Sequence, residues 1–144
     1  MSIVLRGSLA MQRMRTLGLA CGVIALLPAA AVAEGALFVS IPSKGLRDGF
    51  AYGAGYDYPT EREALTNSKA RCEEQAEKSG VDQNCRLVAQ FKKKCFAVAM
   101  DGTDKWAGWA IGDTKEAASA RAKAECSKEA PNCQVSDVAC DSGP

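Results

Sequence analysis

The feature that most constrains the fold is an internal duplication. A shift of 54 residues places Thr60 on Thr114 and Cys72 on Cys126. The further matches, some of which need gaps, are Tyr52 with Trp106, Lys69 with Lys123, Cys85 with Cys133 and Cys95 with Cys140. Two copies of one unit are expected to fold as two related halves. We therefore expect a single domain over residues 34–144, with repeat one over about 36–94 and repeat two over about 95–140.

Six of the seven cysteines lie in the repeats. They are Cys72, Cys85, Cys95, Cys126, Cys133 and Cys140. An even set in a short chain is typical of a disulfide framework, and no pair has the C-x-x-C spacing of redox motifs and zinc ribbons. A twofold relation between the halves leaves seven of the fifteen pairings. Among these we favour three: Cys72–Cys85 and Cys126–Cys133, which close short loops, and Cys95–Cys140, expected to join equivalent points of the halves.

Each copy shows the same order of secondary structure. Alternating aromatic and small residues predict strands over 49–56 and 105–111. Further strands are expected over 36–40, 86–91, 96–100 and 134–139, and helices over 61–78 and about 114–128. The helices carry a stripe of small residues, and their capping boxes are Thr60 with Glu63 and Asp113 with Glu116. The order predicts an α+β fold: two pseudo-symmetric β-β-α-β repeats that form antiparallel sheet with two packed helices, fastened by disulfides.

Residues 1–33 have the three parts of a signal peptide. Arg13 and Arg15 precede an apolar run over residues 17–27, and small residues end at Ala33, after which we expect cleavage. The run is shorter than the roughly 20 residues of a membrane span, so we expect no stable membrane insertion after cleavage. A leader and a disulfide framework together predict an exported protein, either periplasmic or secreted. Met1, Met11 and Met14 are alternative start positions.

The pattern of the two repeats resembles a known family. Its features are an aromatic and glycine-rich strand, a Thr or Ser helix cap, alanines on the helix stripe, a cysteine at Cys72 or Cys126, and two later cysteines on strands. In these features, from about Gly35 to Cys140, the chain resembles a bacterial exported family known as domain of unknown function 4189. The resemblance implies export and this fold. It implies no catalytic residue, because the family has no established activity to transfer.

The composition excludes several function classes. The chain contains no histidine, which removes the commonest general base and the commonest neutral metal ligand. Residues 1–33 hold three arginines and no acidic residue, so the net charge falls from +1 for the whole chain to −2 for the remainder. A nearly neutral body argues against nucleic-acid binding. Asp101 and Asp104 share a short turn, but their spacing does not match a calcium loop, so no metal and no cofactor is assigned.

Two groups of residues are candidates for binding. Lys92, Lys93 and Lys94 form the densest basic run, which suits either a docking patch for an acidic partner or a soluble turn that protects a sheet edge. The aromatic candidates for an exposed anchor are Tyr56, Tyr58 and Trp109. Tyr52 and Trp106 are expected in the core, because the repeat makes them equivalent. Alternation places Trp106 and Trp109 on opposite faces of their strand.

These observations favour a binding protein over an enzyme. We expect a non-enzymatic exported module of the cell envelope that binds another exported protein, for example an inhibitor or immunity protein that covers the cleft of a toxin or cell-wall hydrolase. One alternative is binding of peptidoglycan or an anionic glycan through the lysines and exposed aromatics. Another is a secreted protein that interacts with a host. The remaining alternative is an uncharacterised enzyme with an unusual acid/base pair, for which no catalytic residue is assigned.

Overall fold

The computed structural model describes residues 34–41, 49–103 and 105–142. The predicted signal peptide and its cleavage site lie outside these residues. The elements are β1 (Glu34–Ser40), β2 (Tyr52–Tyr58), α1 (Glu61–Lys78), β3 (Cys85–Phe91), β4 (Cys95–Met100), β5 (Ala107–Gly112), α2 (Lys115–Cys126) and β6 (Gln134–Cys140). The two β-β-α-β repeats and the α+β class are confirmed. The glycine-rich strands begin slightly later than expected, at Tyr52 and Ala107.

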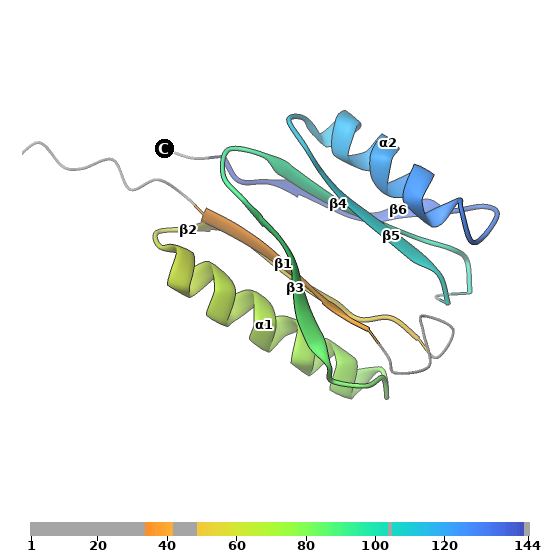
Figure 1. Ribbon diagram of the computed structural model, residues 1–144, viewed down its shortest axis with the longest axis horizontal. Coiled ribbons are helices and arrows are strands. Elements are labelled where there is room, and N and C mark those ends of the chain that lie inside the picture. The colour runs from red at the N-terminus through yellow and green to blue at the C-terminus, as the bar shows by residue number, and fades with distance from the viewer. Residues whose placement is uncertain (1–33, 42–48, 104, 143–144) are drawn as a thin grey trace, which may run out of the picture.

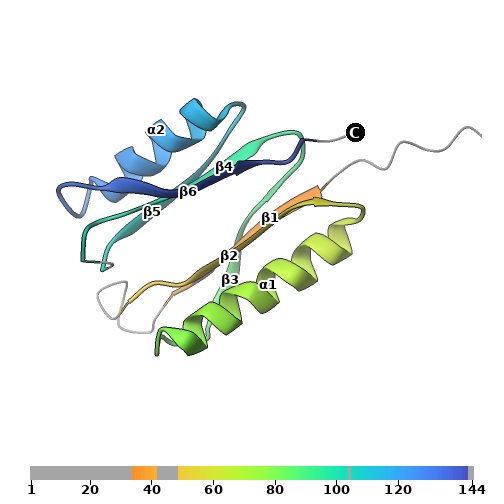
Figure 2. The ribbon, with the colours of Figure 1, turned by 180° about the vertical axis from the view of Figure 1, so that it is seen from behind.

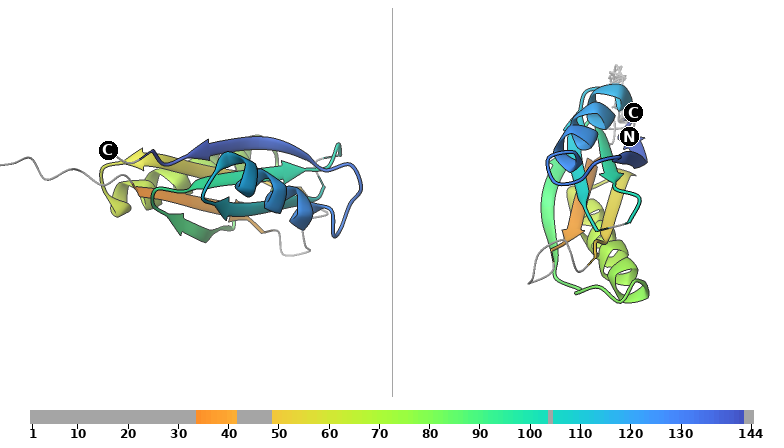
Figure 3. Two further views of the ribbon diagram at one scale, coloured as in Figure 1. Left: turned by 90° about the horizontal axis from the view of Figure 1, so that it is seen from above. Right: turned by 90° about the vertical axis from the view of Figure 1, so that its right-hand side faces the viewer.

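Each repeat forms its own antiparallel sheet of three strands. The strand order is β2-β1-β3 in the first half and β5-β4-β6 in the second. Figures 1 and 2 show the two sheets facing each other, with α1 on the outer side of one and α2 on the outer side of the other. The molecule is therefore a sandwich of four layers in which the central strands, β1 and β4, are buried on both faces. In Figure 3 the left view looks down on α2 with the strands behind it, and the right view shows α2 and α1 on opposite sides of the strands.

Short side chains let each helix lie close to its sheet. The buried residues of α1 are Ala64, Ser68, Cys72 and Ala76, the stripe expected from the sequence. A Cβ atom on Gly53 would overlap the backbone of Ser68 and Cys72, and one on Gly108 would overlap that of Ala122 and Cys126. Because these contacts are with backbone atoms, a side chain could not move aside to relieve them. Glycine at these two strand positions therefore sets the distance between helix and sheet.

The helix caps agree with the sequence in one repeat and correct it in the other. The Thr60 hydroxyl accepts the N–H of Glu63 at 3.2 Å, as the predicted capping box requires. In the second repeat the cap is Thr114, which accepts the N–H of Ala117 at 3.1 Å, so the assignment to Asp113 was wrong. Thr114 has the extended backbone that a cap needs, whereas Asp113 forms an ion pair with Lys94. The repeat itself points to Thr114, which matches Thr60.

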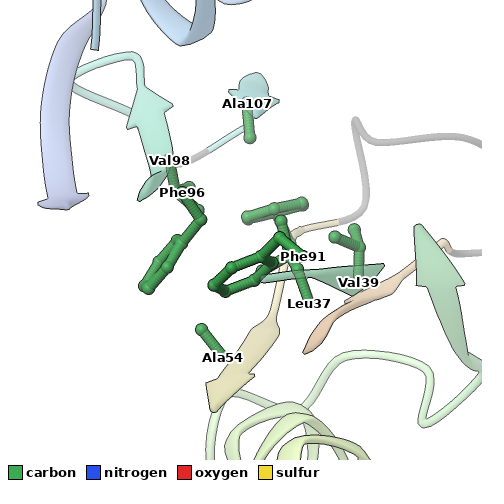
Figure 4. Packing of buried hydrophobic residues seen from close by; sticks show 8 residues of the cluster. Leu37, Val39, Ala54, Phe91, Phe96, Val98 and Ala107 are labelled. Atoms are coloured by element: carbon green, nitrogen blue, oxygen red, sulfur yellow. The ribbon is translucent and has the colours of Figure 1, made fainter. Parts of the chain in front are cut away.

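The inner faces of the two sheets form the largest core cluster. Its buried residues are Leu37, Val39, Phe50, Ala54, Phe91, Phe96, Val98 and Ala107. Figure 4 shows the rings of Phe91, from the first half, and Phe96, from the second, close to each other, and their centroids are 5.9 Å apart. Smaller clusters lie under each helix. The contact between the halves is thus an apolar sheet-on-sheet interface.

The strand registers define which residues of the two repeats are equivalent. Gly53 and Gly108 take the same place against their helices, so Tyr52 corresponds to Ala107 and not to Trp106. The segment between this glycine and the helix cap is one residue longer in repeat one than in repeat two. The ungapped shift of 54 residues therefore pairs Tyr52 with the wrong residue. Tyr52 packs against the cluster between the sheets, whereas Trp106 packs against the cluster under α2. The expected equivalence of these two aromatics is therefore wrong.

The structure contains the three disulfides that the repeat favoured. They are Cys72–Cys85, Cys95–Cys140 and Cys126–Cys133. Cys95 and Cys140 are direct partners in the β4–β6 ladder, so this bond lies inside the second half and does not join equivalent points of the two halves. The registers place Glu34 and Lys92 at the corresponding positions of repeat one. These two side chains form an ion pair at 2.7 Å, where repeat two has a disulfide.

Candidate functional site

The three candidate lysines lie in the linker between β3 and β4. All three are exposed, but Lys92 pairs with Glu34 at 2.7 Å and Lys94 pairs with Asp113 at 3.0 Å. Lys93 has a positive φ of 52° and donates its backbone N–H to the carboxylate of Asp141 at 2.9 Å. Two of the three charges therefore have a counter-charge within the chain. This arrangement fits a structured turn better than an open basic patch.

The structure separates the three aromatic candidates. Tyr56 is the exposed one, with 41% of its surface accessible, and its ring lies 6.1 Å from that of Phe96. Tyr58 is half-buried against the cluster under α1. Trp109 is half-buried between the sheets and stacks on Phe50, so it does not stand out as an anchor on an open face. As expected, Trp106 and Trp109 lie on opposite faces.

A groove of about 420 Å³ runs along β2, the free edge strand of the first sheet. One wall is α1, and the other includes Asp137 of β6 in the second half. Its lining residues are Tyr52, Gly53, Ala54, Tyr56, Arg71, Glu74, Gln75, Lys78 and Asp137. Tyr56 is the predicted binding residue that contributes to it. We call this hollow the β2 groove.

The outer edge of β2 faces this groove. The N–H of Ser40 donates to the carbonyl of Ala51 at 2.8 Å, which fixes the alternation of the antiparallel ladder. The backbone groups of Tyr52 and Ala54 therefore point away from β1. Arg71 on α1 donates to the outward carbonyl of Ala54 at 2.9 Å. The guanidinium thus occupies part of an edge that could otherwise pair with an added strand.

The β2 groove has a counterpart in the second half with different charges. That hollow, of about 320 Å³, is lined by Ala107, Gly108, Trp109, Glu125, Lys128 and Glu129. Arg71 and Glu74 of α1 match Glu125 of α2 and Lys128, which follows α2, so the sign of the charge is reversed at both. The two repeats therefore carry a hollow at matching places, with different chemistry in each. Arginine and two tyrosines, which are common at binding hot spots, are found in the first groove.

Two residues that line the β2 groove form a hydrogen bond between the halves. The Tyr52 hydroxyl donates to Asp137 Oδ2 at 3.3 Å. Burial of the ring, followed by the negative charge of Asp137 and this hydrogen bond, raises the pKa of Tyr52 to about 12. Tyr52 is therefore a neutral donor near neutral pH. A general base needs a pKa close to the working pH, so this pair is suited to positioning and not to proton abstraction.

A second polar contact between the halves lies at the far end of β2. The buried Asp141 carboxylate accepts the backbone N–H groups of Asp57 at 3.2 Å and Lys93 at 2.9 Å. Asp57 and Lys93 both have a positive φ, which aims these N–H groups at the carboxylate. Ser142 in turn donates two hydrogen bonds of 2.8 Å to Asp57, and these lower the pKa of that carboxyl. The contact fixes the chain end against the linker.

Residues 34–41, 49–103 and 105–142 contain no group of three His, Cys, Asp or Glu side chains placed to hold a metal ion. Within the same ranges, no helix is long and apolar enough to cross a membrane. Asp101 accepts the N–H groups of Lys105 and Trp106 and thereby organises its turn. Asp104 lies outside the described residues.

Sequence reasoning missed three residues of the β2 groove, namely Tyr52, Arg71 and Asp137. Tyr52 alternates like a core residue and was assigned there. Arg71 carries a weak signal, because it lies next to the stripe residue Cys72 and its charge is reversed in the matching residue of repeat two, Glu125. Asp137 lies on a strand of the other half, and no local pattern relates that strand to β2.

The comparisons with known proteins bear on the family. A family model described as "Domain of unknown function (DUF4189)" matches residues 38–140. No curated protein matches the chain. A solved structure, the NMR structure of Rv1813c from Mycobacterium tuberculosis, is similar at 17% identity and a TM-score of 0.45, covering 95% of this chain and 98% of that one. The family match spans both repeats and all six paired cysteines, and the chain belongs to the DUF4189 family, a domain of unknown function.

Proposed function

We propose that this protein is a non-enzymatic, exported module of the bacterial cell envelope that binds another exported protein through the β2 groove. The observation that carries the proposal is the groove itself: a free strand edge flanked by Tyr56, Tyr52 and Arg71. An extended segment of a partner could pair its backbone with the part of this edge that Arg71 leaves open, while its side chains contact the tyrosines. Tyrosine and arginine provide large contact areas with polar tips, which suits such a surface.

The disulfides support an exported role. Three of them form and persist in an oxidising compartment, such as the periplasm or the extracellular space. They also hold each helix and sheet in place before a partner arrives, which reduces the entropy lost on binding. The most specific version of the proposal is an inhibitor or immunity protein that covers the cleft of a toxin or cell-wall hydrolase.

Photo-crosslinking tests the proposed site. A photoreactive phenylalanine derivative replaces Tyr56 in the exported protein, and the matched control carries it at Thr66, an exposed position of α1 outside the groove. We expect one discrete crosslinked partner from Tyr56 and none from Thr66. Equal labelling from both positions would contradict a groove-specific partner.

Substitutions then measure the contribution of the groove to affinity for the crosslinked partner. Arg71→Ala and Tyr56→Ala should each weaken binding by roughly tenfold or more, as expected for hot-spot residues. Arg62→Ala is the control, because Arg62 is exposed on the same helix but does not line the groove. Unchanged affinity in both groove variants would place the interface elsewhere.

Binding of peptidoglycan or an anionic glycan is less well supported. Two of the three linker lysines are paired with acidic residues, and Trp109 is half-buried between the sheets. Sedimentation with purified sacculi separates the two hypotheses. Retention that is abolished by salt and by Lys93→Ala would favour the polymer over a protein partner.

A further inference from the structure

We infer that two copies of this chain can exchange halves through the linker Lys92–Lys94. In the resulting dimer, the first half of each chain would pack on the second half of the other. We call this species the exchange dimer. The inference does not depend on the proposed binding function, because it rests on the interface between the halves.

Within residues 34–41, 49–103 and 105–142, the linker is the only covalent connection between the halves. Among the residues that the structure describes, every disulfide lies within one half. Each half also contains its own sheet, its own helix and the small cluster between them. The halves can therefore separate without breaking a disulfide or a strand ladder. What separation exposes is the inner face of each sheet.

The two inner faces are pseudo-equivalent. Leu37 and Val98 occupy the same register position in β1 and β4, and both are fully buried between the sheets. Ala54 and Trp109 match in the same way in β2 and β5. Every contact between the halves of one chain can thus form between two chains. The hydrogen bond from Tyr52 to Asp137 would also form across the exchanged interface.

The linker has the properties of a hinge under tension. It contains three residues between Phe91, the last residue of β3, and Cys95, the first of β4, and in Figure 1 the chain crosses there from one sheet to the other. Lys93 adopts a positive φ of 52°, which a residue with a side chain adopts at an energetic cost. A straighter linker removes that cost. Short, strained hinges favour domain swapping for this reason.

The length of the linker controls the balance between monomer and exchange dimer. Within one chain the halves meet at an effective concentration in the millimolar range, so dilute protein is expected to be monomeric. Exchange becomes favourable when the linker is too short to turn back. It also becomes favourable when the protein refolds at high concentration.

The first experiment changes the hinge and measures mass by light scattering after size-exclusion chromatography. Deletion of Lys93, with the disulfides oxidised, should raise the dimer fraction at least tenfold over the unmodified protein refolded at the same concentration. Lys93→Gly should lower it, because glycine adopts a positive φ without strain. A deletion variant that folds as a monomer would contradict the inference.

The second experiment distinguishes exchanged halves from two intact monomers side by side, and it also decides the matter if the deletion variant does not fold. Leu37→Asp disrupts the inner face of the first half, and Phe96→Asp disrupts that of the second. Each variant alone should fail to give folded protein. Refolded together, they should give a soluble heterodimer in which one undamaged pair of halves assembles. Absence of any heterodimer from the mixture would overturn the inference.

Discussion

At the scale of single residues, Ser68 carries a buried hydroxyl group whose hydrogen-bonding capacity is not used. It is fully buried on α1, and within the described residues its hydroxyl has no hydrogen-bond partner. A buried hydroxyl without a partner costs about 1–3 kcal/mol relative to one that is paired. The equivalent position of α2 is Ala122, which carries no polar group. The second repeat therefore indicates that alanine fits this buried helix position.

Replacement of Ser68 by alanine should stabilise the protein. Ser68→Ala removes the unsatisfied hydroxyl and improves helix propensity, so we expect the free energy of unfolding to rise by about 1 kcal/mol. Ala122→Ser is the matched reverse change and should lower it by a similar amount. Urea unfolding with the disulfides intact measures both. A loss of stability in Ser68→Ala would mean that the hydroxyl has a role in folding.

Tyr52 leads to a prediction about alkaline pH. Burial and Asp137 raise its pKa to about 12, above the value of about 10 in an unfolded chain. A raised pKa means that the folded state holds the proton more tightly. The corresponding stability is fully present below about pH 10 and is lost as the pH rises towards about 12.

Absorbance titration of the phenolate measures this shift. One tyrosine step near pH 12 is expected in the unmodified protein and should be absent from Tyr52→Phe. Asp137→Asn should move the step to lower pH, although burial alone keeps it above 10. An identical titration curve in Tyr52→Phe would show that the step belongs to another residue.

At the scale of helices and strands, most of the structure could be predicted because its signals are local. The bounds of α1 follow from Thr60 at its start and Gly80 after its end, where a φ of +66° suits glycine. The N–H of Val81 returns to the carbonyl of Ala76 at 2.9 Å and completes this helix end. At the start of α2, Asp113 and Thr114 are both suitable N-cap residues. The capping-box spacing to Glu116 favoured Asp113, which is not the cap. Lys94, which pairs with Asp113, comes from the linker between β3 and β4, far away in the sequence.

The packing of α1 on β2 should be sensitive to a single methyl group. Gly53→Ala would force Cβ into the backbone of Ser68 and Cys72, and we expect a loss of about 3 kcal/mol from this overpacking. Gly102→Ala is the matched control, because a Cβ there meets no atom within 4 Å. Thermal unfolding of both variants measures the difference. Equal stability would show that the helix can move outward at little cost.

At the scale of the whole molecule, the duplication predicted the units but not how they meet. Two β-β-α-β repeats and their cysteines are visible in the sequence. The face-to-face stacking of two separate sheets depends on Phe91, Phe96 and other apolar residues that look alike for either one continuous sheet or two. The β2 groove could not be predicted for the same reason. Asp137 and Tyr52 belong to different halves and come together only when the two sheets pack on each other.

The equivalence of the repeats also predicts a fourth disulfide. Glu34 and Lys92 occupy in the first half the positions of Cys95 and Cys140 in the second, at the end of a paired ladder. Their ion pair joins an exposed lysine to a half-buried glutamate and is expected to contribute about 1 kcal/mol or less. Glu34→Cys combined with Lys92→Cys should therefore oxidise as readily as the native pair. The loop it closes is long enough for a gain of about 2–4 kcal/mol.

Thiol counting and urea unfolding test this prediction together. The double variant should have no more reactive thiols than the unmodified protein, while each single variant should have one more. A double variant with two reactive thiols under conditions that oxidise the native cysteines would show that the two ladder ends differ in geometry. Because both new cysteines belong to the first half, the bond should stabilise that half without tying it to the second. The double variant should therefore gain stability.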